Sequence, residues 1–562
     1  MTSKAKPPWA AIIDRILSNL LEGWHVIRTR GPNQVQFWLI ALAVGIASGA
    51  AALGFRKGIE ALQAYLYRTE DITRLSTFAG DLPWYWVLAI PILGGLTVGV
   101  ILHLFTPDGR VRSVADVIEG AALNNGRVEE RAGLASAAAS LITLSTGGSS
   151  GREGPVVHLA SVISSRVLHW MKADGVTGRD LLGCAVAAAV SASFNAPIAG
   201  ALFALEVVLR HFAIHAFAPI VIASVAGTVI NRLEFGGVTE FTLPAASMLQ
   251  FYEELPAFLI LGAICGLVAG TLMRSIFAAE DVASYVQRRY HVPRWLRPGL
   301  AGALLGILAI WFPHIIGVGY ETTSLALTGQ ILFWPAVYLT VIKTLAVSIT
   351  IGGRMGGGVF SPSLMIGALT GLAFGHIATA IFPDVSGSAT LYALAGMGGV
   401  AAAVLGAPIS TTLIVFELTG DWATGLAVMV TVSISTAIGT RLVDRSFFLT
   451  QIERRGVHLA AGPQAYLLGL LKAQQVMRPR GDKRAPPDEE CWERIEAGDY
   501  IDAQSTLEAA LPAFDRSGAV YLPVVQLTRA DQPPDLLGAL YHVDALRAYN
   551  RALAATAAEE HS

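Results

Sequence analysis

The stretch Ser145–Pro155 reads STGGSSGREGP, and the interpretation of the rest of the chain depends on it. Apolar segments precede and follow it, so we expect its charged residues to lie at membrane depth. A carboxylate in that environment costs several kcal/mol and usually marks a functional site. Glu153 is therefore the first candidate functional residue. The alternative is a polar loop at the membrane surface in which Arg152 and Glu153 face water.

The same stretch predicts a break between two helices. Its glycines let the backbone leave helical geometry, and Pro155 suits the first turn of a new helix. The start of that helix presents N–H groups without partners and a partial positive charge. We therefore expect an anion site with backbone contributions from Gly151, Arg152 and Gly154.

The composition indicates the class of protein. The chain has 562 residues, of which 53% are hydrophobic and 15% charged, and its mean hydropathy is +0.54. These values are typical of a polytopic helical membrane protein. A net charge of -2 and the lack of a long Lys/Arg run argue against nucleic acid as a partner. The three cysteines, Cys184, Cys265 and Cys491, are scattered, and the histidines are dispersed. We therefore expect no disulfide framework, no metal site and no cofactor.

The distribution of charge predicts the orientation in the membrane. Residues 1–30 have the spacing of an interfacial amphipathic helix, and their basic residues place this end in the cytoplasm. Residues 36–55 then cross outward and residues 86–105 cross back, so Ser113 starts a segment near the inner face. An even number of crossings returns the C-terminus to the cytoplasm. We expect a multi-pass protein of the cell (inner or plasma) membrane with both termini cytoplasmic.

The remaining apolar segments are frequently short. Many cannot span about 30 Å of hydrocarbon as a helix, and such discontinuous helices usually converge on a substrate site near the membrane midplane. The segments are approximately 131–144, 155–170, 180–193, 197–210, 214–232, 256–278, 296–312, 335–351, 361–382, 388–404, 407–418 and 421–440.

An internal repeat supports this interpretation. The sequence API at 196–198, followed by Glu206, recurs at 407–409, followed by Glu417 with the same spacing. Two halves, about 31–232 and 251–440, are expected for a transporter built from inverted repeats. We interpret Glu206 and Glu417 as structural carboxylates that accept hydrogen bonds; the alternative is that they carry protons.

Three motifs resemble those of the CLC family of chloride channels and chloride/proton antiporters. They are GREGP at 151–155, GVFSP at 358–362 and FNAP at 194–197, and the resemblance covers about residues 30–456. A fourth family motif, GSGIP, is degraded here, and only Ser113 remains of it. The resemblance implies an all-α membrane domain over 31–456 with an inverted-repeat fold and broken half-helices. It also implies a homodimer in the lipid membrane with one anion pathway per subunit.

The resemblance also assigns roles to individual residues. The hydroxyl of Ser113 and the backbone N–H groups of Val359 and Phe360 are expected to bind chloride. Neutral donors suit this task because conduction requires binding that is weak enough to release the ion. Glu153 is expected to be the gate: its ionised carboxylate occupies the anion site, and its protonation or displacement opens the path.

Two departures from the family pattern bear on the mechanism. Proton-coupled members carry a second glutamate at the position of Val207, and valine cannot relay a proton. The inner tyrosine of the family aligns with Phe448, which keeps the bulk of the inner constriction and loses the hydroxyl donor. Both changes favour passive chloride permeation with little or no proton coupling. The alternative is a chloride/proton antiporter in which buried water carries the proton.

From about residue 457 the chain becomes polar and charged, which predicts a cytoplasmic tail over 457–562. Residues 473–550 resemble a single cystathionine-beta-synthase (CBS) repeat, and alternation at 519–525 predicts a half-buried strand. We therefore expect a small α/β domain. Because only one repeat is present, it is expected to pair across the dimer, and adenine nucleotide binding is not expected. The alternative is a remnant that only stabilises the dimer.

One short motif matches a different class of protein. GSSG at 148–151 matches the GxSG pattern of rhomboid intramembrane serine proteases, with Ser149 or Ser150 as nucleophile. Four small residues match such a pattern easily, and the histidines show no suitable placement. We therefore expect a transport protein and not an enzyme.

Overall fold

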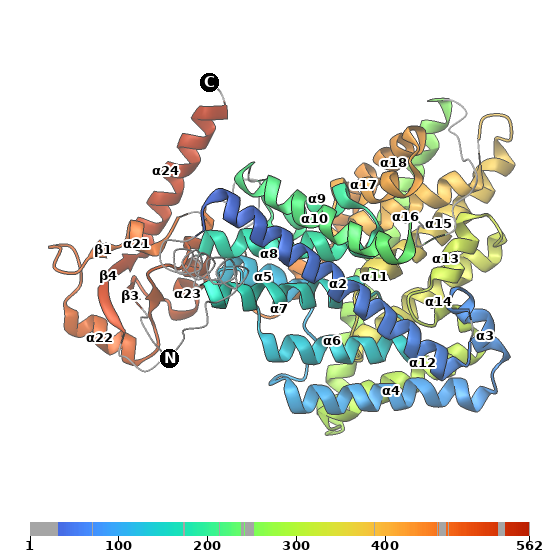
Figure 1. The fold of residues 1–562 in the computed structure, drawn as a ribbon, viewed down its shortest axis with the longest axis horizontal. Helices are drawn as coiled ribbons and strands as arrows, with labels where there is room; N and C mark the ends of the chain where they lie inside the picture. Colours follow the sequence, from blue (N-terminus) through green and yellow to red (C-terminus); the bar gives the residue numbers. More distant parts are fainter. Residues whose placement is uncertain are drawn as a thin grey trace, which may run out of the picture.

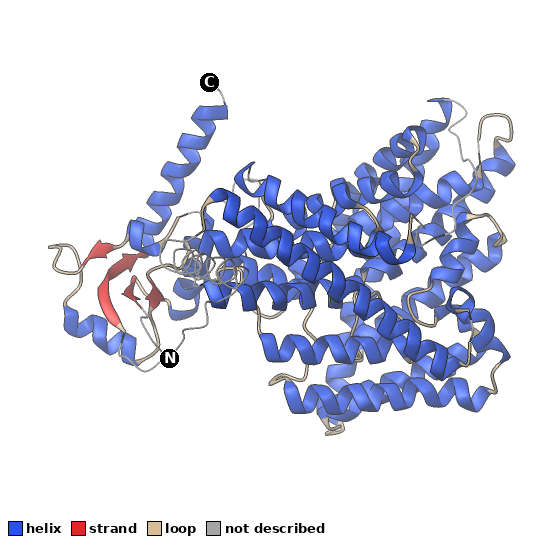
Figure 2. Cartoon of the chain, in the orientation of Figure 1, coloured by secondary structure: helices blue, strands red, loops and turns tan. Residues whose placement is uncertain are grey.

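The computed structural model describes residues 32–69, 71–171, 175–212, 214–237, 241, 252–386, 388–457, 459, 468–469, 471–526 and 534–560. The amphipathic helix predicted for residues 1–30 lies outside the described residues. The described chain forms a large helical body joined to a small domain that contains the strands (Figures 1 and 2).

Helices of very different length make up the body. In chain order they are α2 (Gln34–Tyr67), η1 (Ile72–Arg74), α3 (Leu75–Asp81), α4 (Trp84–Phe105), α5 (Val114–Leu123), α6 (Glu130–Ser145), α7 (Glu153–Met171), α8 (Gly175–Phe194), α9 (Pro197–Phe203), η2 (Ala204–Leu209), α10 (Ile214–Phe235), η3 (Tyr252–Glu254), α11 (Leu255–Arg289), η4 (Arg294–Leu296), α12 (Arg297–Trp311), η5 (Pro313–Ile315), α13 (Tyr320–Leu327), α14 (Phe333–Gly352), α15 (Phe360–Ile381), α16 (Ala389–Leu405), α17 (Pro408–Thr419), α18 (Trp422–Leu442) and α19 (Phe447–Glu453).

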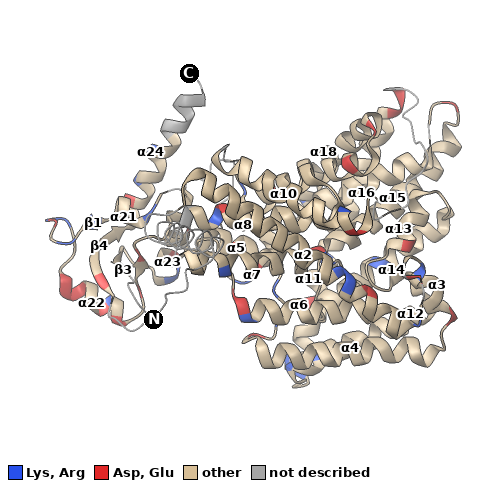
Figure 3. Cartoon of the chain, in the orientation of Figure 1, with Lys and Arg blue, Asp and Glu red and all other residues tan. Residues whose placement is uncertain are grey.

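Seven helices of the described chain are long and apolar enough to cross a membrane. The apolar helices Pro197–Leu209, Ala389–Leu405 and Pro408–Thr419 are shorter. Charged residues gather in the small domain and near helix ends, while most of the helical body is uncharged (Figure 3). The prediction of an all-α polytopic membrane protein with broken half-helices is confirmed.

Two short helices from the two halves of the chain cap each other. The carboxylate of Glu206 accepts bonds of 2.9 and 2.8 Å from the first N–H groups of α17. The carboxylate of Glu417, near the end of α17, accepts bonds of 3.0 and 2.8 Å from the first N–H groups of α9. The two segments are therefore antiparallel, as an inverted repeat requires. The prediction that both carboxylates accept hydrogen bonds is confirmed.

Small residues allow the central helices to approach one another closely. A Cβ atom at Gly371 of α15 would lie 2.0 Å from the carbonyl oxygen of Tyr392 in α16. Any larger residue at this position would force the two helices apart. Close backbone contact of this kind is the usual way in which helices associate in a lipid environment.

The small domain holds a four-stranded sheet in the order β1-β4-β3-β2. In the described part of the tail, β2 and β3 pair in parallel, whereas β1–β4 and β3–β4 are antiparallel pairs. The elements of the domain are α21 (Ala473–Val476), β1 (Arg478–Pro479), α22 (Asp488–Glu496), β2 (Ile501–Asp502), α23 (Leu507–Ser517), β3 (Tyr521–Gln526), β4 (Asp535–Tyr541) and α24 (His542–Glu560). The predicted small α/β domain is confirmed.

Strand β3 differs from the prediction of a half-buried strand. Its four central residues, 522–525, are all buried, so burial does not alternate. Val524 packs in a cluster with Phe514 of α23, whereas Val525 packs in another cluster with Ile495 of α22. Because helices cover both faces of the sheet here, both sets of side chains are apolar.

Candidate anion pathway

The two predicted helix breaks lie side by side. The N–H of Gly151 donates to the carbonyl of Gly358 at 2.7 Å, and the N–H of Gly358 donates to the carbonyl of Gly151 at 2.7 Å. This pair of bonds places the start of α7 beside the start of α15. It also corrects one prediction: the N–H of Gly151 is used within the protein, so Gly151 joins the two loops and does not offer its N–H to an anion.

Glu153 begins α7, and its carboxylate reaches the start of α15. The side chain is 2% exposed. It accepts a hydrogen bond from the hydroxyl of Ser361 and another, of 3.4 Å, from the backbone N–H of the same residue. The first N–H groups of a helix attract negative charge. The carboxylate thus occupies a position that suits an anion.

A cavity of about 30 Å³ adjoins this carboxylate. Its lining includes Ser113, Glu153, Val359, Phe360 and Phe448, which come from distant parts of the chain. The volume exceeds the roughly 10–15 Å³ that a cavity needs to hold one water molecule. The structure therefore brings the predicted gate, the predicted anion donors and the predicted inner constriction to one small space. Gly154 lines the same cavity.

Ser113 is held at one end of this space by its own helix. Its N–H donates to the carboxylate of Asp116 at 2.7 Å, and its hydroxyl lies 3.3 Å from the side-chain oxygen of Gln451. Asp116 in turn pairs with Arg455 at 2.8 Å, which balances its charge. Gln451 was not predicted. The signal was its position three residues after Phe448, which places both on one helical face.

Aromatic rings form part of the wall. The ring of Phe360 lies 4.7 Å from that of Phe194 and 5.8 Å from that of Phe203, measured between centroids. Phe447 and Phe448 line the cavity from α19. Phe448 is 4% exposed and offers no hydroxyl. An anion here therefore meets both polar groups and apolar rings.

Arg152 faces a second, larger cavity. Its guanidinium donates to the carbonyl of Ser193 at 3.0 Å and lies 5.3 Å from the centre of the Tyr320 ring. It also lines a cavity of about 770 Å³ together with Arg56 and Arg74. Arg152 therefore has a structural bond and at the same time contributes positive charge to the mouth of this cavity.

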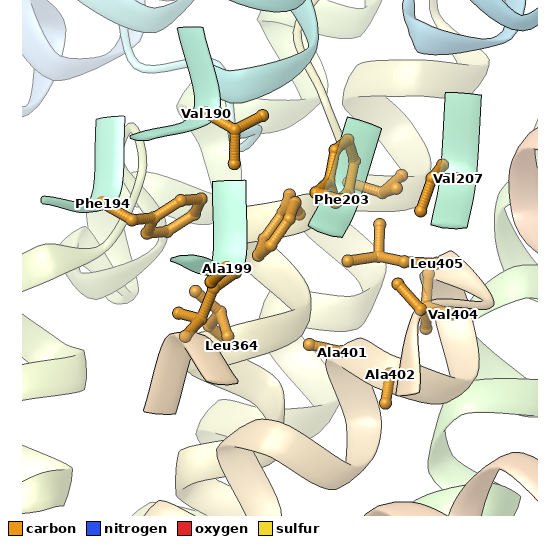
Figure 4. Close-up of a cluster of buried hydrophobic side chains, with 14 of the residues drawn as sticks. Val190, Phe194, Ala199, Phe203, Val207, Leu364, Ala401, Ala402, Val404 and Leu405 are labelled. Atoms are coloured by element: carbon orange, nitrogen blue, oxygen red, sulfur yellow. The ribbon is translucent and has the colours of Figure 1, made fainter. Parts of the chain in front are cut away.

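Val207 lies in an apolar environment. It belongs to η2, a segment of π-helix, and is 6% exposed. Figure 4 shows it beside Phe203, Val404 and Leu405. The neighbouring Glu206 is occupied in capping α17. Val207 is therefore apolar, and the carboxylate of Glu206 is already engaged by backbone N–H groups.

His158 is one of the histidines near the GSSG motif, and its burial was not predicted from the sequence. It lies in α7, five residues after Glu153, and is 2% exposed. Neither of its ring nitrogens has a hydrogen-bond partner among the described residues. An unpaired buried polar group is costly, so such a residue needs an explanation. No pattern in the sequence separated it from the other histidines.

The protease alternative finds no support in the geometry. The hydroxyls of Ser149 and Ser150 are buried, and neither is hydrogen-bonded to a partner in the described chain. A serine nucleophile needs a base within hydrogen-bond distance.

Within the described ranges, no group of three or more His, Cys, Asp or Glu residues is placed to hold a metal ion.

Comparisons with known proteins agree with this geometry. Residues 94–440 match the family model described as voltage gated chloride channel. A ClcB-like protein of Ralstonia nicotianae is 32% identical over 394 residues, covering 69% of this chain and 90% of its own. The voltage-gated ClC-type chloride channel ClcB of Escherichia coli is 29% identical over 424 residues, covering 73% of this chain and 97% of its own.

Two solved structures share the fold. A slow cyanobacterial Cl⁻/H⁺ antiporter matches with a TM-score of 0.65 at 22% identity, covering 75% of this chain and 98% of that chain. A CLC-type fluoride/proton antiporter matches with a TM-score of 0.60 at 22% identity, covering 73% and 96%. At this identity the likeness concerns the fold alone. The family model and the relatives, together with the paired helix breaks, show that the chain belongs to the CLC family of voltage-gated chloride channels and transports anions across a membrane.

Proposed function

We propose that this protein conducts chloride passively and that Glu153 gates the pathway by competing with the anion for its site. The observation that carries the proposal is the position of the Glu153 carboxylate, which accepts hydrogen bonds from Ser361 at the start of α15. Chloride is expected to take that place when the carboxylate leaves. The Ser113 hydroxyl and the Val359 and Phe360 N–H groups then serve as neutral donors, which allow fast release.

The environment of Val207 supports passive conduction over exchange. Obligatory exchange needs a titratable group that passes protons between the inner solution and the gate. Val207 lies among apolar side chains, and Glu206 already accepts two backbone hydrogen bonds. Phe448 lacks a hydroxyl at the inner constriction, so it cannot hold chloride by a hydrogen bond. Weak chloride binding at the inner constriction favours fast conduction.

A second candidate function, chloride/proton exchange, is favoured by His158. This side chain is buried, can carry a proton and lies on the same helix as Glu153. A water molecule beside it is the simplest route for a proton toward the gate. Exchange through His158 makes a distinct prediction: a phenylalanine at this position abolishes proton movement and leaves chloride movement intact.

We further propose that the protein is a homodimer in the membrane, with both termini in the cytoplasm. Helix α9 contacts α10 and α17, and α17 contacts α18. These four helices expose apolar side chains, which suits a subunit interface; the exposed residues include Ile198, Phe217, Val225, Val229, Ile409 and Met429. We expect the CBS-like tail either to pair with the tail of the other subunit or only to stabilise the dimer, and we expect it to bind no adenine nucleotide.

The decisive experiment measures the reversal potential of purified protein in liposomes under opposed chloride and proton gradients. Passive conduction predicts a potential that follows the chloride gradient alone. Uphill proton movement driven by chloride contradicts it and supports exchange. Chloride, nitrate and fluoride permeation are compared in the same liposomes, and Ser113→Ala tests the serine hydroxyl. Loss of preference for chloride in this variant is expected if Ser113 contacts the ion.

A further inference from the structure

A cavity of about 720 Å³ opens at the C-terminal end of α4. The end of α4, the start of α6 and η4 supply its walls, including the side chains of His103, Arg131, Arg294 and Trp295. No residue of this cavity lines the small pathway cavity. A volume of this size suits a small molecule or a lipid headgroup.

Two arginines give the cavity a positive charge that no described side chain neutralises. Among the described residues, no ion pair or hydrogen bond involves the side chain of Arg131 or Arg294. The guanidinium of Arg131 lies 5.5 Å from the centre of the Phe105 ring, so its orientation is supported by an aromatic face. Arginine in this state binds phosphate well, because its planar donors match two phosphate oxygens.

The acidic residues of the cavity do not cancel this charge. Glu129 pairs at 2.8 Å with an arginine that lies outside the lining, and Glu130 pairs at 3.3 Å with another. The arginine that pairs with Glu129 also pairs with Asp108, so this counter-ion is shared, but both carboxylates of the lining contact arginines outside it. The cavity is left with the charge of Arg131 and Arg294.

Apolar surfaces lead away from the cavity along two neighbouring helices. On α4, a candidate membrane span, Leu93, Val100 and Leu104 are exposed at helical spacing. On α12, which packs against α4, exposed apolar side chains also recur at helical spacing: Leu300, Leu304, Ile307 and Trp311. Trp295, at the edge of the cavity, is 39% exposed, and tryptophan is enriched where a membrane meets water.

We propose that this cavity binds the phosphate of an anionic phospholipid, with Arg131 and Arg294 as its ligands and the acyl chains on the exposed faces of α4 and α12. The predicted orientation places the end of α4 at the cytoplasmic face, where anionic lipids attract basic side chains. A soluble phosphate lacks the acyl chains, so it gains nothing from these apolar faces.

Native mass spectrometry of the full-length protein in detergent tests this site. Phosphatidylglycerol is titrated against phosphatidylcholine, and inorganic phosphate is added in a separate titration. We expect Arg131→Gln/Arg294→Gln to weaken phosphatidylglycerol binding by about tenfold or more, since each basic residue near a membrane surface contributes about 1 kcal/mol. The matched control is Arg288→Gln/Arg289→Gln, which removes two exposed arginines at the end of α11.

Each outcome decides the proposal. Selective loss of phosphatidylglycerol binding in the cavity variant, with unaltered thermal stability before lipid is added, supports it. Equal losses of phosphatidylglycerol binding in the cavity and control variants overturn it, because the lipid then responds to the positive charge of the surface in general and not to this cavity. Competition by inorganic phosphate at concentrations similar to those of the lipid also overturns it, because the cavity is then a soluble anion site.

Discussion

Glu153 and Ser361 lie 208 residues apart in sequence, and the Ser361 hydroxyl donates a hydrogen bond to the buried Glu153 carboxylate. The two residues come from the two halves of the chain, so the proposed gate exists only where both halves meet. The paired bonds between Gly151 and Gly358 fix this meeting point. A change at either end of the contact is therefore expected to act on the gate.

Glu153→Gln is expected to leave the pathway open at all pH values. In the unaltered protein, chloride flux is expected to follow the fraction of molecules in which the Glu153 carboxylate is protonated. While most of these carboxylates are ionised, that fraction rises by up to about tenfold for each pH unit of acidification. The variant lacks that group, so its flux stays flat across the same range. Chloride efflux from liposomes between mildly acidic and neutral pH measures this. A variant that keeps the response of the unaltered protein to acid contradicts the proposed gate.

Ser361→Ala is expected to raise chloride flux at neutral pH. Loss of a hydrogen bond to a charged group costs roughly 1.5–3 kcal/mol, so the carboxylate leaves its site about tenfold more often, or more. Thr370→Ala is the matched control, because its hydroxyl bonds to the carbonyl of Ile366 in its own helix at 2.8 Å. Efflux assays of both variants compare them. Equal flux in the two variants shows that the Ser361 contact does not hold the gate.

Glu206→Gln and Glu417→Gln are each expected to lower stability without altering ion coupling. Loss of a good helix cap typically costs about 0.5–2 kcal/mol. Thermal unfolding in detergent measures the loss, and proton and chloride fluxes are followed in the same preparations. The two variants should behave alike because the caps are reciprocal. A selective loss of proton movement in Glu206→Gln, with normal stability, assigns it a role in proton transfer instead.

The contact between the tail and the membrane domain is expected to depend on pH. Glu508 of α23 is 5% exposed and lies 3.9 Å from Arg179 and 3.5 Å from Arg210. Burial raises the pKa of Glu508 further than the two arginines lower it. A group with a raised pKa stabilises the contact at low pH, and this contribution is lost as pH rises through the raised pKa.

Hydrogen exchange in α23 measures this contact. Protection is expected to fall as pH rises in the unaltered protein and to be independent of pH in Glu508→Gln. Glu489→Gln, on an exposed part of α22, should keep the behaviour of the unaltered protein. Identical pH profiles in all three proteins rule out Glu508 as the titrating group.

A cysteine at Ile409 is expected to cross-link two subunits if the proposed interface is right. Ile409 is 47% exposed, and the three native cysteines are buried, so the background reaction is small. Leu93→Cys on α4 is the control, since Leu93 is 63% exposed on a different helix. Gel electrophoresis after treatment of liposomes with a short bifunctional reagent measures the product. Equal cross-linking at both positions indicates random collision and contradicts the interface.

The sequence by itself determined the class of the fold and most residues of the candidate site. Apolar segments and glycine-proline breaks are local features, so they predicted the broken helices and the importance of Glu153. The repeat predicted that Glu206 and Glu417 hold equivalent places. Burial of β3 on both faces could not be predicted, because it depends on helices that precede and follow it in the chain.

Only the tertiary structure decided which partners these residues have. It showed that the N–H of Gly151 is used by Gly358, that the two repeat glutamates cap each other's helices, and that Gln451 faces Ser113. It also showed that His158 is buried with no hydrogen-bond partner in the part of the chain that the structure describes. The physical reason is that hydrogen bonds and burial join residues that are distant in sequence, whereas helix propensity and hydrophobic pattern are properties of neighbouring residues.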